Sequence, residues 1–430
     1  MCFRIKTVPL IAAAWLLASG IAGADILDSL WTASTLDLSL LERAVIARNP
    51  SLAAGKAAWR EMKARADAAG ALDDPMLDLM AAPGSFGKRD VEAAYSIGLS
   101  QGLPIFGQRG LRGRAARSEA RAAGEDYRAT AQALIHETRR LYFEYYAVAR
   151  GLEVNRDLSD LLGQFRRVAI QRYAAGTAGQ QDALQAEVEI AMLDHQRVVL
   201  GRDRRIVVAQ IRALLHDDTE RALPEAPLEL AEARVLDDPD SEVAVAMRFR
   251  PELRGRAALR DARQEELRVA RRARWPEVTL QARYDRFMDV SQWRTSVGLG
   301  LNLPIGWGRI GANERAAQAG LERAEEERVA ERDRVLAEIT TARARAEEAM
   351  HEVHIVDTSV VPATERALAS VRAGYESNRS DFLSLLNAER DLARARLDGY
   401  RARAELGMAL ADLDRALGAA PAGLDEEVGP

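Results

Sequence analysis

The sequence predicts a mixed α/β membrane protein, in which three chains share a 12-stranded β-barrel of four strands each that continues into a barrel of long helices. Three observations predict this fold. The segment GLSQGLPIFGQRG, at 98–110, is nearly repeated as GLGLNLPIGWGRIG at 298–311. Apolar and polar residues alternate before each of these prolines, which is typical of strands. Between Pro104 and Pro224 there is no proline, as expected for long helices.

The composition favours long helices packed through small residues. The chain has 430 residues, of which 48% are hydrophobic but only 5% aromatic, while 29% are charged. Alanine, leucine, arginine and glutamate dominate, a bias typical of extended helical proteins. The net charge of −5 gives no indication of a nucleic-acid partner, and the arginines alternate with acids as on solvated helix faces.

The N-terminus resembles a secretory signal peptide. Two basic residues precede an apolar stretch at 8–17, and Ala22 and Ala24 form an A-x-A cleavage site, so we expect residues 1–24 to be removed. A retained anchor is the alternative, but the stretch is shorter than the roughly 20 residues of a spanning helix. Cys2 is the only cysteine and would leave with the signal, so we expect no disulfide, thiolate metal site or acylated cysteine in the mature chain.

The whole unit, and not one motif, is duplicated. The segment beginning at Asn49 matches the one at Arg250, and the segment at Gln171 matches the one at Ala373, with an offset of about 200 to 202 residues throughout. We therefore predict a first repeat at 25–223, a linker at 224–241, a second repeat at 242–418 and a flexible tail at 419–430.

Each copy is predicted to contain two strands. In the second copy, Val278, Leu280, Ala282 and Tyr284 share one face and alternate with polar residues. In the first copy, Gln101 interrupts the corresponding apolar row. The predicted strands are at about 76–83, 92–103, 277–287 and 293–303.

Each copy also contains a helix and a long helical hairpin. The helix follows Pro50 or Pro251, since proline suits a first turn. The hairpins are predicted at about 107–217 and 310–417, and the first outgoing arm would be about 100 Å long at 1.5 Å per residue. Pro362 should kink the second outgoing arm. Helices of this length must pack lengthwise in a bundle or tube.

The strand pattern predicts a barrel wall with lipid outside and water inside. Trp275, Trp293 and Trp307 flank the second strand pair as an aromatic belt would, although packing tryptophans would give the same pattern. Four strands cannot close a barrel, and an open strand edge is not tolerated in lipid. Three chains would supply twelve strands, so we expect a homotrimer in contact with membrane lipid.

Four segments resemble the outer membrane factor family of TolC-like channels. They are GLSQGLPIFGQRG, YAAGTAGQQDALQAEVEIAMLD, GLNLPIGWG and AGYESNRSDFLSLLNAERDLARARL. The resemblance extends from about residue 36 to 417. It implies a trimeric outer-membrane β-barrel continued by a periplasmic α-helical barrel, with a periplasmic adaptor (membrane fusion) protein and an inner-membrane transporter as partners and no cofactor. The stretch YAAGTAGQQDAL is most similar to the heavy-metal efflux branch.

This resemblance implies a passive conduit of a tripartite system that exports small solutes, either metal ions or drugs. The alternative within the same fold is the outer-membrane exit duct of a type I protein secretion system. Because the pump and the adaptor select the cargo, the channel sequence says little about the substrate.

Two other classes of protein fit the sequence less well. We expect no enzyme, because the chain has no G-x-S-x-G, HExxH, P-loop or Cys–His constellation. His351 and His354 lie one turn apart near Glu347 and Glu348 and could bind a metal, but such pairs on charged helices are more often solvated. A soluble coiled-coil scaffold would leave the signal peptide and the strands without purpose.

The resemblance also implies a pore gate just after each hairpin turn. Asp182 matches the family's gating aspartate, with Gln181 beside it, and Tyr375 matches the gating tyrosine. Ser384 and Asn387 stand where the family often has a ring of aspartates, so the chain departs from the pattern there.

A charge could still be supplied at this gate by Asp381, paired with Arg379. The alternative is that Asp182 and Asp381 are carboxylates at helix N-termini, where the helix dipole favours negative charge. One residue can have both roles.

The hairpin turns are the expected contacts with the adaptor. Gly176 suits a C-terminal cap with positive φ, and Asn378, which also tolerates that conformation, stands in its place in the second copy. The expected contact residues are Ala175, Gly176, Thr177, Ser377 and Asn378.

Overall fold

The computed structural model describes residues 28–86, 93–104, 106–177, 179–219, 221–231, 234, 236–288, 291–377 and 379–419. The predicted signal peptide, Asn378 and all of the predicted tail except Ala419 lie outside these ranges. The chain divides into two compact units. Unit 1 comprises Met1–Ala53, Thr130–Arg250 and Val335–Pro430, and unit 2 comprises Ala54–Ala129 and Pro251–Arg334.

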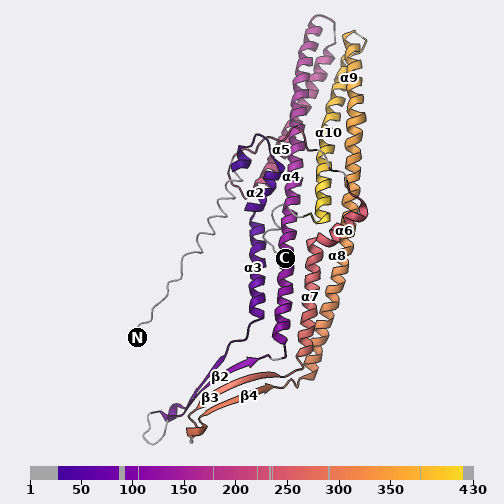
Figure 1. Cartoon of the computed structure of the whole chain (residues 1–430). Helices are drawn as coiled ribbons and strands as arrows, with labels where there is room; N and C mark the ends of the chain where they lie inside the picture. Colours follow the sequence, from indigo (N-terminus) through magenta and orange to yellow (C-terminus); the bar gives the residue numbers. More distant parts are fainter. Residues whose placement is uncertain are drawn as a thin grey trace. The chain divides into compact units, whose positions relative to one another are not determined.

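Long helices and four strands make up the described chain (Figure 1). The main helices are α2 (Leu38–Arg48), α3 (Pro50–Ala69), α4 (Gln108–Ala174), α5 (Gln180–Leu215), α6 (Pro239–Phe249), α7 (Pro251–Arg272), α8 (Trp307–Ile355), α9 (Val361–Glu376) and α10 (Phe382–Leu417). The strands are β1 (Met76–Ala81), β2 (Tyr95–Leu103), β3 (Glu277–Asp285) and β4 (Thr295–Asn302). None of the described helices contains an apolar stretch with the length and hydropathy of a membrane span.

The four strands of unit 2 form one antiparallel sheet in the order β1-β2-β3-β4 (Figure 1). The register aligns the apolar rows across strands, since Leu99 pairs with Ala282 and Leu280 pairs with Leu299. This face is open, because Val297 and Leu299 are each 74% exposed. The period-two pattern therefore gives an exposed apolar face, as predicted.

The two copies turn from strand to helix in different ways. Gly107 has a φ of +73°, a conformation that glycine adopts at little cost, and α4 starts at the next residue. In the second copy, Ile305 N–H donates to the carbonyl of Leu303 and Trp307 N–H donates to that of Ile305. The second copy therefore enters its helix through two tight turns, where the first copy uses the positive φ of Gly107.

The core of unit 1 lies where α2, α4 and α5 meet. Its fully buried members include Leu41, Leu141 and Ile211. Tyr145 is buried with them, and its hydroxyl donates to the carbonyl of Pro224 at 3.0 Å. This contact satisfies the polar group of a buried aromatic ring, as burial requires.

Unit 1 also shows the duplication in its contacts. Asn49 ends α2 and donates to the carbonyl of Leu214 at the end of α5. Arg250 ends α6 and donates to the carbonyl of Arg415 at the end of α10. Both contacts span 165 residues. The two copies therefore anchor their returning helices in the same way.

A π-helical turn, Val356–Val360, separates α8 from α9. Pro362, which the sequence predicted to kink this arm, lies in the first turn of α9. In a regular α-helix the ring of a proline clashes with the carbonyl four residues earlier, and this wider turn stands at that position.

Candidate functional site

The first hairpin of unit 1 turns through a Schellman motif. Gly176 has a φ of +72° and donates its N–H to the carbonyl of Tyr173, while Thr177 N–H donates to that of Arg172. These two bonds satisfy carbonyls that the end of α4 would leave unpaired. The predicted positive φ at Gly176 is observed, and its Cα is open to solvent with nothing within 4 Å of an added Cβ.

In the second hairpin turn, one side chain and several backbone N–H groups satisfy the carbonyls at the end of α9. The Ser377 hydroxyl donates to the carbonyl of Ala373 at 2.8 Å. The carbonyl of Gly374 accepts the backbone N–H groups of Arg379 and Ser380. Asn378, the predicted counterpart of Gly176, lies outside the described residues.

Asp381 is the N-cap of α10. Its carboxylate accepts the backbone N–H of Ser384 at 2.9 Å, and hydrogen bonds from Ser384 lower the pKa of Asp381. Arg379, its suggested partner, donates to the Ser377 hydroxyl at 3.0 Å. The helix-terminus interpretation thus describes the contacts of Asp381.

The other predicted gate residues lie along the starts of the returning helices. Asp182 stands in the first turn of α5, where the helix dipole favours a carboxylate, and it is half-buried. Gln181 beside it is exposed, as are Ser384 and Asn387 on α10. Gln181, Ser384 and Asn387 are therefore open to solvent in a single chain, and Asp182 is so only in part.

Tyr375 is held between the two hairpins. The Arg172 guanidinium lies over its ring, 4.7 Å from the centroid, and the ring of Phe382 lies 6.4 Å away. A second contact joins the hairpins farther along, where Arg390 on α10 pairs with Glu189 on α5 at 2.9 Å. A cation–π contact and an ion pair therefore link the hairpins near their turns.

Sequence reasoning missed Arg172, Glu189 and Arg390 in this region. The one available signal was the repeat, because Glu189 and Arg390 are 201 residues apart and so lie at equivalent positions of the two copies. Equivalence alone does not bring two residues into contact, so the ion pair required the packing of the hairpins to be known.

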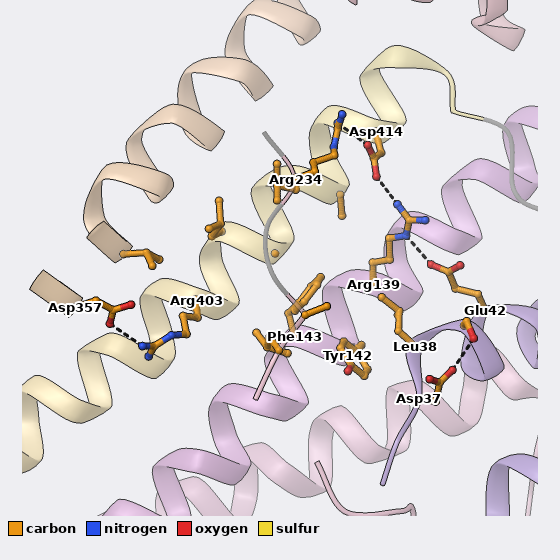
Figure 2. A pocket seen from close by; sticks show the side chains of 18 residues that line it. Asp37, Leu38, Glu42, Arg139, Tyr142, Phe143, Arg234, Asp357, Arg403 and Asp414 are labelled. Carbon is orange, nitrogen blue, oxygen red and sulfur yellow. Dashed lines mark hydrogen bonds and ion pairs between the residues drawn. The ribbon is translucent and has the colours of Figure 1, made fainter. Parts of the chain in front are cut away.

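A cavity of about 920 Å³ lies elsewhere in unit 1 (Figure 2). Arg139 pairs with Glu42 at 2.6 Å and with Asp414 at 2.5 Å, and Arg234 pairs with Asp414 at 2.7 Å. The lining residues are Asp37, Leu38, Ser39, Glu42, Arg139, Tyr142, Phe143, Leu230, Ala231, Arg234, Val353, Asp357, Arg403, Leu406, Gly407, Leu410, Ala411 and Asp414.

The charges that line this cavity compensate one another. Burial alone would lower the pKa of Arg139, but its carboxylate partners raise that pKa above its ordinary value. Burial also raises the pKa of the Tyr142 phenol to about 12. The described residues contain no cluster that could hold a metal ion, His351 and His354 included. The arrangement fits a structural ion-pair network.

Comparisons with known proteins agree with this fold. The model of the outer membrane efflux protein family matches residues 41–215 and 245–419. The cobalt-zinc-cadmium resistance protein CzcC of Cupriavidus metallidurans is 24% identical over 158 residues. That match covers 37% of this chain and 38% of CzcC, so it spans well under half of the relative's length.

Solved structures match nearly the whole chain. A crystal structure of CusC has a TM-score of 0.77 at 18% identity and covers 90% of this chain and 94% of its own. The outer-membrane channel OprN has a TM-score of 0.75 at 20% identity, covering 89% of this chain and 90% of its own. A membrane protein from Pseudomonas aeruginosa has a TM-score of 0.74 at 22% identity, covering 90% and 95%. The chain belongs to the outer membrane efflux protein family, and it is an outer-membrane channel with a periplasmic extension, not an enzyme.

Proposed function

We propose that three copies of this chain form the exit duct of a tripartite efflux system for small solutes. A periplasmic adaptor and an inner-membrane transporter would deliver the cargo, and the channel would conduct it passively. The observation that carries the trimer is the sheet of unit 2. Its apolar face is exposed, and β1 and β4 are the outer strands of the described sheet.

The outer strands β1 and β4 would be costly to leave unpaired in a membrane. Backbone groups at an open strand edge have no water to bind inside lipid, and each unsatisfied group there costs several kcal/mol. One chain with four strands leaves two such edges. Joining β4 of each chain to β1 of the next removes every edge, and an even number of antiparallel strands closes with neighbouring strands still antiparallel.

Metal ions are the cargo that we favour. CzcC is named a cobalt-zinc-cadmium resistance protein, and it matches part of this chain. Protein secretion through the same fold is the competing function.

The cargo is tested with a deletion strain complemented by the wild-type chain. We expect deletion to raise sensitivity to divalent Co²⁺, Zn²⁺ or Cd²⁺, and complementation to restore growth. Unchanged metal sensitivity together with loss of a secreted protein from the medium would overturn metal export and support the secretion duct.

The hairpin turns are the proposed contacts with the adaptor. Ala175, Gly176 and Thr177 are exposed in the first turn and Ser377 in the second, so a partner could reach them. Substituting Thr177→Trp adds bulk at the turn. We expect it to abolish efflux while the trimer remains, and intact efflux would mean that these are turns without a partner.

A further inference from the structure

The π-helical turn between α8 and α9 weakens the backbone of this arm. Val361 N–H donates to the carbonyl of Val356, five residues earlier. Pro362 has no N–H, so it gives no hydrogen bond to the turn that precedes it. Such turns are rare, and sharp bends in helices occur at prolines and π-turns. This point therefore resists bending less than the rest of the arm.

Helix α10 packs closely against this turn. Gly399 faces it, and a Cβ at that position would stand 3.3 Å from Cγ1 of Val356. One turn farther along α10, Arg403 pairs with Asp357 of the π-turn at 2.6 Å (Figure 2). Both side chains are more than a third exposed, and an ion pair that water reaches in this way breaks readily.

Open space adjoins the turn. Asp357 and Arg403 line the cavity of about 920 Å³ and also a second one of about 700 Å³, which Gly399 borders as well. Protein interiors are ordinarily close-packed and transmit strain, so a segment can move only where such space exists. The Asp357 side of the turn therefore borders space into which it can shift, while Val356 packs against α10.

We propose that the π-helical turn Val356–Val360 is a hinge about which α9 and the hairpin turn beyond it move when the channel opens. The Asp357–Arg403 ion pair holds the hinge in the observed position, and Gly399 leaves it room. This inference rests on the proposed channel function, because the residues moved include Tyr375 of the gate.

The test measures distances across the hinge by pulsed electron spin resonance on the full chain in detergent. Spin labels are placed at Glu352→Cys and Ser370→Cys, which flank the turn. The control pair, Asn387→Cys and Glu405→Cys, spans the same number of residues within α10. All four positions are exposed, and each pair would be about 27 Å apart on a straight helix.

Two further variants test whether the π-turn and its ion pair determine the spread of distances. Deleting Thr358 together with Pro362→Ala removes the extra residue and the proline, so that α8 and α9 become one straight helix with their faces kept in register. Arg403→Gln releases the ion pair but keeps the turn. We expect a broader distance distribution at the hinge than in the control pair, broader still in Arg403→Gln, and narrowed to the control width in the straight-helix variant.

A hinge distribution as narrow as the control, unchanged by Arg403→Gln, would overturn the proposal. So would full efflux by the straight-helix variant, whereas loss of efflux with trimers retained supports it. If the wild-type chain neither formed trimers nor exported solute, the proposed function would fail, and the distances would still decide whether the turn bends.

Discussion

Arg250 shows how a single charged side chain holds the second repeat together. It is 2% exposed, it donates to the carbonyls of Arg415 and Ala416, and it pairs with Glu338. Substituting Arg250→Met leaves the Glu338 carboxylate and two helix-end carbonyls without this donor. Removing one partner of a buried pair costs about 3–5 kcal/mol, and we expect the lower end because Glu338 keeps contact with water.

Chemical denaturation measures this loss of stability, with the exposed Arg204→Met as the matched control. Equal stability of the two variants would show that Arg250 is not an anchor. The sequence placed Arg250 at the position equivalent to Asn49, but it could not predict the burial, since arginine is ordinarily an exposed residue.

The proposed role of Asp182 and Tyr375 in a pore gate can be tested by substitution. Asp182→Ala combined with Tyr375→Phe removes a carboxylate and a hydroxyl but keeps the ring that packs with Arg172 and Phe382. If these groups close the pore, the double variant should raise single-channel conductance in planar bilayers. An unchanged conductance with a small loss of stability would assign both residues to helix and hairpin packing alone.

For the proposed gate residues, the sequence predicted positions along the chain but only some of the contacts. The turn at Gly176 follows from local chemistry, since glycine favours the positive φ that a Schellman motif requires. The partner of Tyr375 does not, because Arg172 lies on a different hairpin and meets the ring through tertiary packing.

At the scale of elements, alternation predicted the strands better than their ends. Each predicted strand pair is longer than the observed pair at the end where its two strands are joined. The predicted strands at 76–83 and 277–287 run past the ends of β1 and β3, and those at 92–103 and 293–303 begin before β2 and β4. Short 3₁₀ turns at Pro83–Ser85 and Ser291–Trp293 occupy this region. Gln101 breaks the apolar row and yet remains within β2, where its amide donates to the carbonyl of Asp73 at 2.7 Å. A backbone partner thus satisfies the side chain that the pattern could not explain.

The apolar face of this sheet can be tested directly. Leu299→Arg places a charge among exposed apolar residues of β4, which costs roughly 2–4 kcal/mol if that face meets the middle of a bilayer. We expect little assembled protein in the outer-membrane fraction. The matched control is Gln281→Arg on the opposite side of β3, which is expected to face water. Equal assembly of the two variants would show that the faces are assigned wrongly.

Long helices were predictable from composition and from the absence of proline, but their irregularity was not. The sequence indicated that Pro362 disturbs the second outgoing arm. The π-turn that precedes it depends on a partner surface, since Gly399 on α10 permits the close approach of Val356. No local pattern contains that information.

For the whole molecule, the duplication was the part best predicted from sequence. Internal similarity at a constant offset identified two copies, and the equal spacing of the Asn49 and Arg250 contacts repeats it in three dimensions. The contacts between copies were not predictable in this way. Glu189 and Arg390 meet because α5 and α10 pack together, and each residue alone resembles any solvated charge on a helix.

We propose that three chains close one barrel by pairing β4 of each chain with β1 of the next. Within a chain, β1 and β4 are separated by two strands, so their backbones lie about 14 Å apart at 4.8 Å per strand. A disulfide requires Cα atoms within about 7 Å and cannot form inside one chain. The one native cysteine, Cys2, lies in the predicted signal peptide, so introduced pairs can be followed without interference.

The most direct measurement is therefore a scan of cysteine pairs, with one position on β1 (Leu77, Leu79 or Ala81) and one on β4 (Val297, Leu299 or Leu301). After oxidation in outer membranes and denaturing electrophoresis without reductant, we expect at least one pair to give cross-linked products that stop at three chains. Single chains for every pair, or a ladder that continues beyond three, would contradict it.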